Sequence, residues 1–167
     1  WHCNIPAIQK LDITENVVDL MAKNIQKLPL ETQTALQLAS CIGNTFALHT
    51  LAGILWHSQA ETLASLQRTV EEGMVIPLDE HYKYAATGMT DKEIQQAGIE
   101  SIFRFAHDRI QQAAYALLSD AERTTIHLRT GRLLLKNSPQ PLKSERLFEI
   151  VKQLNALAKK AIPDPDP

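Results

Sequence analysis

His107 and Asp108 stand where a short alternating strand, residues 102–105, runs into an amphipathic helix. Asp108 is the expected N-cap of that helix, and Gln111, three residues later, is the expected partner in a capping box. His107 would then be held just outside the helix N-terminus, where free N–H groups and the helix dipole attract anions. The arrangement predicts that His107 contacts a phosphate. It also predicts that removing the Asp108 side chain destabilises the fold, whereas removing that of His107 does not.

A plainer interpretation of His107 is a histidine that ends the strand and pairs with Asp108 or with a backbone carbonyl. The phosphate would come from another part of a larger protein, because the chain holds no phosphate-binding loop. It also lacks the motifs G-x-G-x-x-G, H-E-x-x-H and G-x-S-x-G and the kinase signatures. We therefore expect no catalytic residue and no enzyme activity from this chain alone.

The six histidines do not predict a metal site, because no two of them have the three- or four-residue spacing that places two ligands on one helical face. Cys3 and Cys41 are too few for a disulfide framework, so we expect reduced thiols in a cytoplasmic protein. The sequence has neither a membrane-spanning apolar run nor a signal peptide. Its opening on Trp1 and its Pro/Asp ending suggest a piece of something longer.

The chain has 167 residues, of which 44% are hydrophobic, enough to bury one good core or two small ones. Its formal net charge of −2 favours neither nucleic acid nor an acidic membrane as a partner. The composition therefore predicts a folded protein, and we expect protein partners and not nucleic acid or a membrane.

Helical periodicity and stop signals predict a mainly α-helical fold. The expected helices cover 15–28 and 30–42, a third that starts near Phe46 and ends at His57, and a fourth from the capping box at Ser58 to Gly73. Residues 74–78 and 102–105 are expected to pair as a two-stranded hairpin. The polar connection 79–101 holds one short helix, which Thr90 caps. This order is typical of a winged helix with an enlarged wing.

A helix from 109 to 118, a second that follows the capping box at Ser119 and a last one from 144 to about 160 complete the pattern. The last two would form an antiparallel hairpin like the first unit of a TPR-like repeat array. Gly131, in the middle of a helix, indicates close helix contact. The domains expected are a winged helix at 1–118, the hairpin at 119–160 and a disordered Pro/Asp tail at 161–167.

A winged helix raises the question of DNA binding, since its fourth helix would be the one to enter the major groove. That helix carries Arg68 but also Glu61, Glu71 and Glu72. Its net negative charge would repel phosphates. A structural role of the winged helix is therefore favoured over DNA binding.

Several segments together are similar to one family. They are Asn16-Val17-Val18-Asp19-Leu20-Met21, Ile25-Gln26-Lys27-Leu28-Pro29, Thr32-x-x-Ala35-Leu36-Gln37-Leu38-Ala39-Ser40-Cys41-Ile42-Gly43-Asn44-x-Phe46, Phe105-x-His107-Asp108-Arg109-Ile110-Gln111-Gln112-Ala113-Ala114-Tyr115 and His127-Leu128-x-x-Gly131-Arg132-Leu133-Leu134-Leu135. They resemble the segment after the nucleotide-binding core in the STAND-class, AAA-like ATPase region of bacterial multidomain signalling proteins, which join serine/threonine kinase, ATPase, helical repeats and histidine kinase.

The resemblance implies that the winged helix packs on an adjacent ATPase core and presents His107 to the β-phosphate of bound ADP. Residues 106–108 resemble the Met-His-Asp motif of the class: His107 and Asp108 match it, and Ala106 stands in place of the methionine. ADP or ATP with Mg²⁺ would belong to the parent protein, and the partners would be that core and downstream helical repeats. Two alternatives remain: a DNA-binding winged-helix regulator and a TPR-like interaction scaffold.

Overall fold

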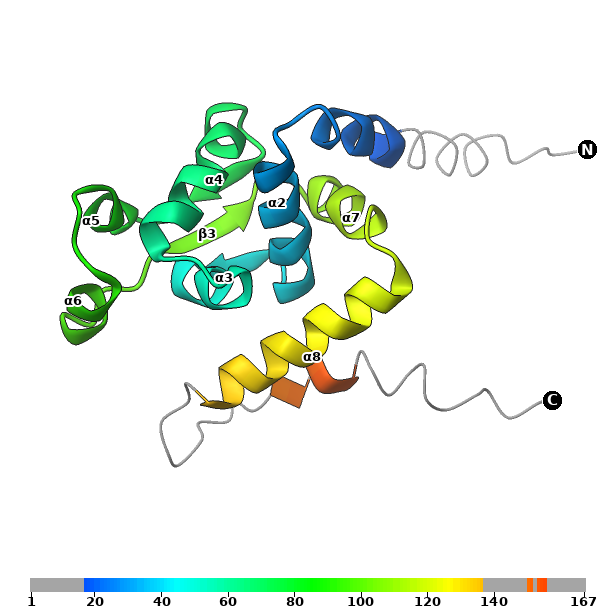
Figure 1. Ribbon diagram of the computed structural model, residues 1–167. Coiled ribbons are helices and arrows are strands. Elements are labelled where there is room, and N and C mark those ends of the chain that lie inside the picture. The colour runs from blue at the N-terminus through cyan, green and yellow to red at the C-terminus, as the bar shows by residue number, and fades with distance from the viewer. Residues whose placement is uncertain (1–16, 137–149, 152, 156–167) are drawn as a thin grey trace, which may run out of the picture.

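The computed structural model describes residues 17–136, 150, 151 and 153–155, and every structural statement below concerns these residues. Residues 17–25 form an N-terminal helix. The elements that follow are α2 (Leu30–Ile42), β1 (Thr45–Ala47), α3 (Leu48–Leu55), α4 (Gln59–Glu71), β2 (Val75–Pro77), α5 (Tyr82–Ala86), α6 (Asp91–Gln96), β3 (Ile102–Phe105), α7 (Asp108–Ala116) and α8 (Asp120–Lys136). Helices dominate and pack against one small sheet (Figure 1). The mainly helical fold expected from the sequence is confirmed.

Three capping boxes start helices where the sequence predicts them. The Ser58 hydroxyl accepts from the Glu61 N–H, and the Glu61 carboxylate accepts from the Ser58 N–H at 2.8 Å. The same reciprocal pattern joins Thr90 to Glu93 at α6 and Ser119 to Glu122 at α8. Each box satisfies backbone donors that a helix start leaves unpaired.

The sheet has three antiparallel strands in the order β1-β3-β2. The predicted hairpin is confirmed, with Val75 opposite Phe105 and Pro77 opposite Phe103. Strand β1 was not expected, because the third helix was predicted to include Phe46. Three residues are too few to show alternation in the sequence, and this strand forms because Phe46 pairs with Phe103 and stacks on it at 6.0 Å.

The main core lies between this sheet and the helices that cover it. Phe46, Phe103 and Phe105 are almost fully buried and meet the inward faces of α2 and α3. The residues of those faces with no exposed surface are Ala35, Leu36, Ala39, Leu48, Leu51 and Ile54. The helical spacing of these apolar positions is what buries them together.

Residues 79–101 connect β2 to β3 and contain two short helices, α5 and α6 (Figure 1). The sequence predicted only the second of them. The Asp79 carboxylate accepts from the His81 N–H at 2.8 Å and from the Ile102 N–H at 3.1 Å. Asp79 therefore closes the base of the connection and is a structural turn residue.

Helix α8 follows α7 after a short turn and packs against α2 and α3, and residues 150, 151 and 153–155 are helical beside it. A Cβ atom placed on Gly131 would lie 3.0 Å from Leu154 Cδ2, so the predicted close contact at Gly131 is confirmed. The rest of the predicted helix 144–160 and the tail 161–167 lie outside the described residues. No described helix combines the length and apolar character needed to cross a membrane.

Candidate functional site

His107 itself is the N-cap of α7. Its backbone is extended, with φ −149° and ψ 142°, and its imidazole Nδ1 accepts a hydrogen bond from the Arg109 N–H at 3.1 Å. The prediction that Asp108 is the N-cap is wrong, because the helix begins one residue earlier than expected and Asp108 is its first residue. Asp108 still places a carboxylate in the first turn, where the helix dipole favours negative charge.

Gln111 does not complete a capping box, so this prediction is also wrong. With His107 as N-cap, Gln111 is the fourth helical residue, one position too far to reach back to the cap. Its Nε2 instead donates to the Ser40 carbonyl oxygen at 3.0 Å, near the C-terminus of α2. Gln111 therefore ties α7 to the end of α2, a contact 71 residues apart that no local pattern indicates.

The cap hydrogen bond also determines what His107 offers to a ligand. Since Nδ1 is the acceptor, the proton of the neutral imidazole is on Nε2. His107 is exposed, and Nε2 makes no hydrogen bond with the described part of the chain. Arg109 is the second residue of the same helix, and its guanidinium donates to the Gln112 side chain at 2.9 Å. The site is thus an exposed N–H donor at a helix start, which can bind an anionic oxygen.

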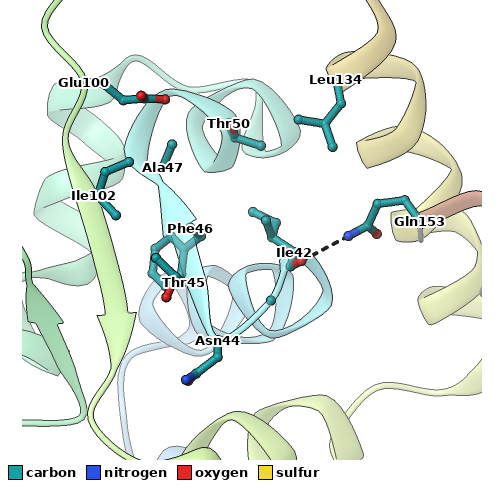
Figure 2. A pocket seen from close by; sticks show the side chains of 11 residues that line it. Ile42, Asn44, Thr45, Phe46, Ala47, Thr50, Glu100, Ile102, Leu134 and Gln153 are labelled. Carbon is teal, nitrogen blue, oxygen red and sulfur yellow. Dashed lines mark hydrogen bonds between the residues drawn. The ribbon is translucent and has the colours of Figure 1, made fainter. Parts of the chain in front are cut away.

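Asn44, on the neighbouring edge of the sheet, is a candidate that sequence reasoning missed. Its carbonyl accepts from the Phe105 N–H at 2.9 Å, two residues before His107. Its side-chain Oδ1 is buried without a hydrogen-bond partner among the described residues. Asn44 lines a pocket of about 400 Å³ that follows β1 to Glu100, with Gln153 at its side (Figure 2). The sequence marked Gly43-Asn44 only as a helix end.

A second polar cluster, which the sequence did not predict, joins four helical segments. His127 of α8 is buried, and its Nδ1 lies 2.6 Å from Gln153 Oε1 while its Nε2 lies 3.2 Å from the Tyr115 hydroxyl of α7. The Gln153 amide donates to the carbonyl oxygens of Cys41 and Ile42, at 3.1 and 3.0 Å. We call Tyr115, His127 and Gln153 the polar lock. It satisfies carbonyls that the C-terminus of α2 would otherwise leave unpaired.

Cys41 lies beside the polar lock as a free, buried thiol. Burial raises the pKa of this thiol to about 11. The thiolate is the reactive form, so Cys41 is unreactive while the surrounding helices stay packed.

Two of the remaining histidines, His49 and His81, have separate structural partners. His49 Nδ1 lies 3.6 Å from the Glu100 carboxylate, and His81 Nδ1 lies 3.0 Å from the Glu100 carbonyl oxygen. Within the described ranges, no three His, Cys, Asp or Glu side chains come together as a metal site would require. His2 and Cys3 lie outside those ranges.

Helix α4 has the charge that the sequence predicts. Arg68 is its single basic residue, and the guanidinium is paired with Glu72 at 2.7 Å. Glu61 is ionised at neutral pH, because hydrogen bonds from Ser58 lower the pKa of its carboxyl. The helix therefore offers phosphates a neutralised cation and exposed carboxylates.

Comparison with known proteins gives one informative similarity. The chain is 32% identical over 156 residues to hybrid signal transduction histidine kinase G of Dictyostelium discoideum. The match covers 81% of this chain but only 4% of that protein, so the chain corresponds to a small segment of its relative. No family model and no solved structure matches the chain.

Proposed function

We propose that this chain is the non-catalytic regulatory module of a STAND-class ATPase switch in a large cytoplasmic signalling protein. Its role is to couple the ADP or ATP state of an adjacent nucleotide-binding core to sensor and kinase domains. The similarity to a segment of a hybrid signal transduction histidine kinase supports a place in signalling. The observation that carries the proposal is the imidazole of His107, fixed at a helix N-terminus with Nε2–H free to donate.

The element order supports a winged helix as the first part of the module. Helices α2, α3 and α4 precede the β2–β3 hairpin, β1 adds a third strand, and residues 79–101 form an enlarged wing. Helix α8 and the helical residues 150, 151 and 153–155 fit the first hairpin of a TPR-like array, in which Gly131 allows close packing. The domain limits proposed are 1–118 for the winged helix and 119–160 for the hairpin.

The site fits a nucleotide phosphate supplied by the neighbouring core. ADP bound there would supply anionic phosphate oxygens as acceptors. His107 would donate from Nε2 while Nδ1 remains on the Arg109 N–H, so ligand binding requires no change of tautomer. The dipole of α7 adds attraction for the same anion.

Movement at His107 would reach the hairpin through the end of α2. There, Gln111 of α7 donates to the carbonyl oxygen of Ser40. Gln153, beyond α8, donates to the carbonyl oxygens of the next two residues, Cys41 and Ile42. A shift of α7 on loss of ADP therefore changes the contacts of the hairpin as well. Exchange for ATP would release the module from a closed, ADP-bound form.

The test compares two variants of the parent protein. His107→Asn keeps a good N-cap, but its shorter side chain carries no donor at the place of Nε2, so we expect faster ADP release and higher basal signalling with unchanged folding. Arg104→Gln, on the exposed face of β3, is the control and should leave ADP release unchanged. Unchanged ADP release in His107→Asn would refute the role of His107.

The isolated chain provides a second test of the proposal. One charge-assisted hydrogen bond contributes about 1.5 to 3 kcal/mol, which is too little for measurable affinity without a phosphate-binding loop. We therefore expect no ADP or ATP binding in the micromolar range by calorimetry. Micromolar binding would contradict the proposal, and nanomolar, sequence-selective binding of duplex DNA at physiological salt would replace it with a transcription regulator.

A further inference from the structure

Trp56 is unfavourable for folding at its position in two respects. It ends α3 with a left-handed backbone, φ 61° and ψ 33°, and no other non-glycine residue in the described part of the chain has a positive φ. Glycine is the usual residue at such a helix end. The indole is also 79% exposed. Folding stability therefore does not explain a tryptophan here, and large exposed aromatics are enriched where proteins bind each other.

Arg129 of α8 lies beside the indole. The Arg129 guanidinium lies 6.0 Å from the centre of the Trp56 ring and donates to the Ile54 carbonyl oxygen at 3.2 Å. This second contact fixes the guanidinium at the C-terminus of α3, where the helix dipole favours a cation. The cation is thus positioned beside the aromatic ring before any ligand arrives, which lowers the entropy cost of binding.

Two more cations continue from Arg129 along α8. Arg132 and Lys136 follow at spacings of three and four residues, which puts all three on one face of the helix. Arg132 and Lys136 are exposed, and none of the three forms an ion pair with the described residues. The acidic residues of α8, Asp120 and Glu122, lie at its other end and are engaged by Arg123 and Ser119.

We propose that this surface, made of Trp56, Arg129, Arg132 and Lys136, binds an acidic protein segment that carries an aromatic side chain. Carboxylates would pair with Arg132 and Lys136, and the aromatic side chain would pack on the indole. The chain as a whole has a net charge of −2, so this basic surface is a local exception. Charge complementarity therefore favours an acidic partner at this surface. Three cations are fewer than the clusters of about four to eight that hold proteins at anionic membranes, and fewer than the phosphate contacts typical of nucleic-acid binding.

The test uses the full chain and a fluorescein-labelled peptide of glutamates around one phenylalanine, with a glutamine version as the neutral control. Fluorescence anisotropy should show binding of the acidic peptide that weakens with salt, and about tenfold weaker binding of the neutral one. Trp56→Gly suits the left-handed backbone, so it should melt no lower than wild type yet bind about tenfold more weakly. Arg132→Gln with Lys136→Gln should weaken binding similarly.

Lys92→Gln, an exposed cation on α6, is the matched control and should leave binding unchanged. Equal loss in this control, or wild-type affinity in Trp56→Gly, would overturn the proposal. Tighter binding to phosphatidylserine vesicles or duplex DNA than to the acidic peptide, with the same dependence on Trp56, would assign the surface to a lipid or a nucleic acid and would also overturn it. None of these outcomes bears on ADP release, so the proposed function is tested separately.

Discussion

At the scale of single residues, His107 has two roles that one substitution can confuse. It stabilises α7 through Nδ1, and it offers Nε2–H to a ligand. A variant that removes the whole imidazole therefore changes folding and binding together. This reverses the expectation from the sequence, in which only Asp108 carried the helix cap.

We predict that His107→Ala lowers the stability of the isolated chain by about 0.5 to 2 kcal/mol, the usual cost of losing an N-cap. Asp108→Ala should cost less, about 0.3 to 1 kcal/mol, because it removes only a favourable charge near the helix dipole. Urea unfolding of the two variants, followed by circular dichroism, measures the order. A larger loss for Asp108→Ala would show that Asp108 is the cap in solution.

At the scale of elements, the capping boxes make helix stability depend on acidic pH. Hydrogen bonds from Thr90 and Ser119 lower the pKa of the Glu93 and Glu122 carboxyls from the ordinary value of 4.5, as Ser58 does for Glu61. A depressed pKa means that the folded state favours the ionised form. The stabilisation is therefore complete above pH 4.5 and disappears as the pH falls through the lowered folded values.

We predict that Glu61→Gln, Glu93→Gln and Glu122→Gln combined make the melting temperature less sensitive to pH below about 4.5. Glutamine keeps a hydrogen-bonding oxygen at each box, but it is uncharged and does not bind a proton on acidification. Melting curves from neutral to acidic pH measure the slope. Glu71→Gln is the control, since Glu71 takes no part in a capping box. A slope as steep as that of wild type would mean that other carboxylates control acid unfolding.

The packing of α8 on the last described helix gives a second element-scale prediction. Gly131→Val should destabilise the chain by about 1 to 3 kcal/mol, the usual cost of overpacking, because its side chain would meet Leu154. Leu154 is 38% exposed, so Leu154→Ala alone should cost little. The double variant should recover part of the loss, a coupling that a double-mutant cycle measures. Strict additivity would indicate that the two helices are not in contact in solution.

At the scale of the whole molecule, the polar lock joins α8 and Gln153 to α7 and to the end of α2. The Gln153 side chain contacts both α8, through His127, and the end of α2, through two carbonyl oxygens. Replacing it leaves several buried polar groups unpaired, which costs about 1 to 3 kcal/mol for each. Separation of these helices would expose Cys41, whose thiol is otherwise buried.

We predict that Gln153→Met increases the rate at which Cys41 reacts with a thiol reagent, in a Cys3→Ser background. Methionine fills similar space without hydrogen bonds, so the α2 carbonyls and His127 lose their partner. The rate of reaction with Ellman's reagent at mildly alkaline pH measures the opening. Gln67→Met, on exposed α4, is the control. Equal rates in Gln153→Met and wild type would show that the lock does not hold the hairpin.

The sequence by itself determined the local parts of this protein. Ser58, Thr90 and Ser119 start helices through partners three residues away, and the 74–78 and 102–105 runs show their strand character locally. These features depend on short-range backbone hydrogen bonding and on apolar periodicity, which adjacent residues define. The nature of α4 as an acidic helix is equally visible in composition.

Only the tertiary structure decided the features that depend on distant partners. Strand β1 forms because Phe46 pairs with Phe103 of β3. The Gln111 side chain donates to a carbonyl oxygen of α2 and does not cap its own helix. Trp56 meets Arg129 across 73 positions of sequence, and the polar lock brings Cys41 to Gln153, which lies 112 residues later. A short strand, a glutamine or an exposed tryptophan has no distinctive local pattern, because its role is set by what packing places beside it.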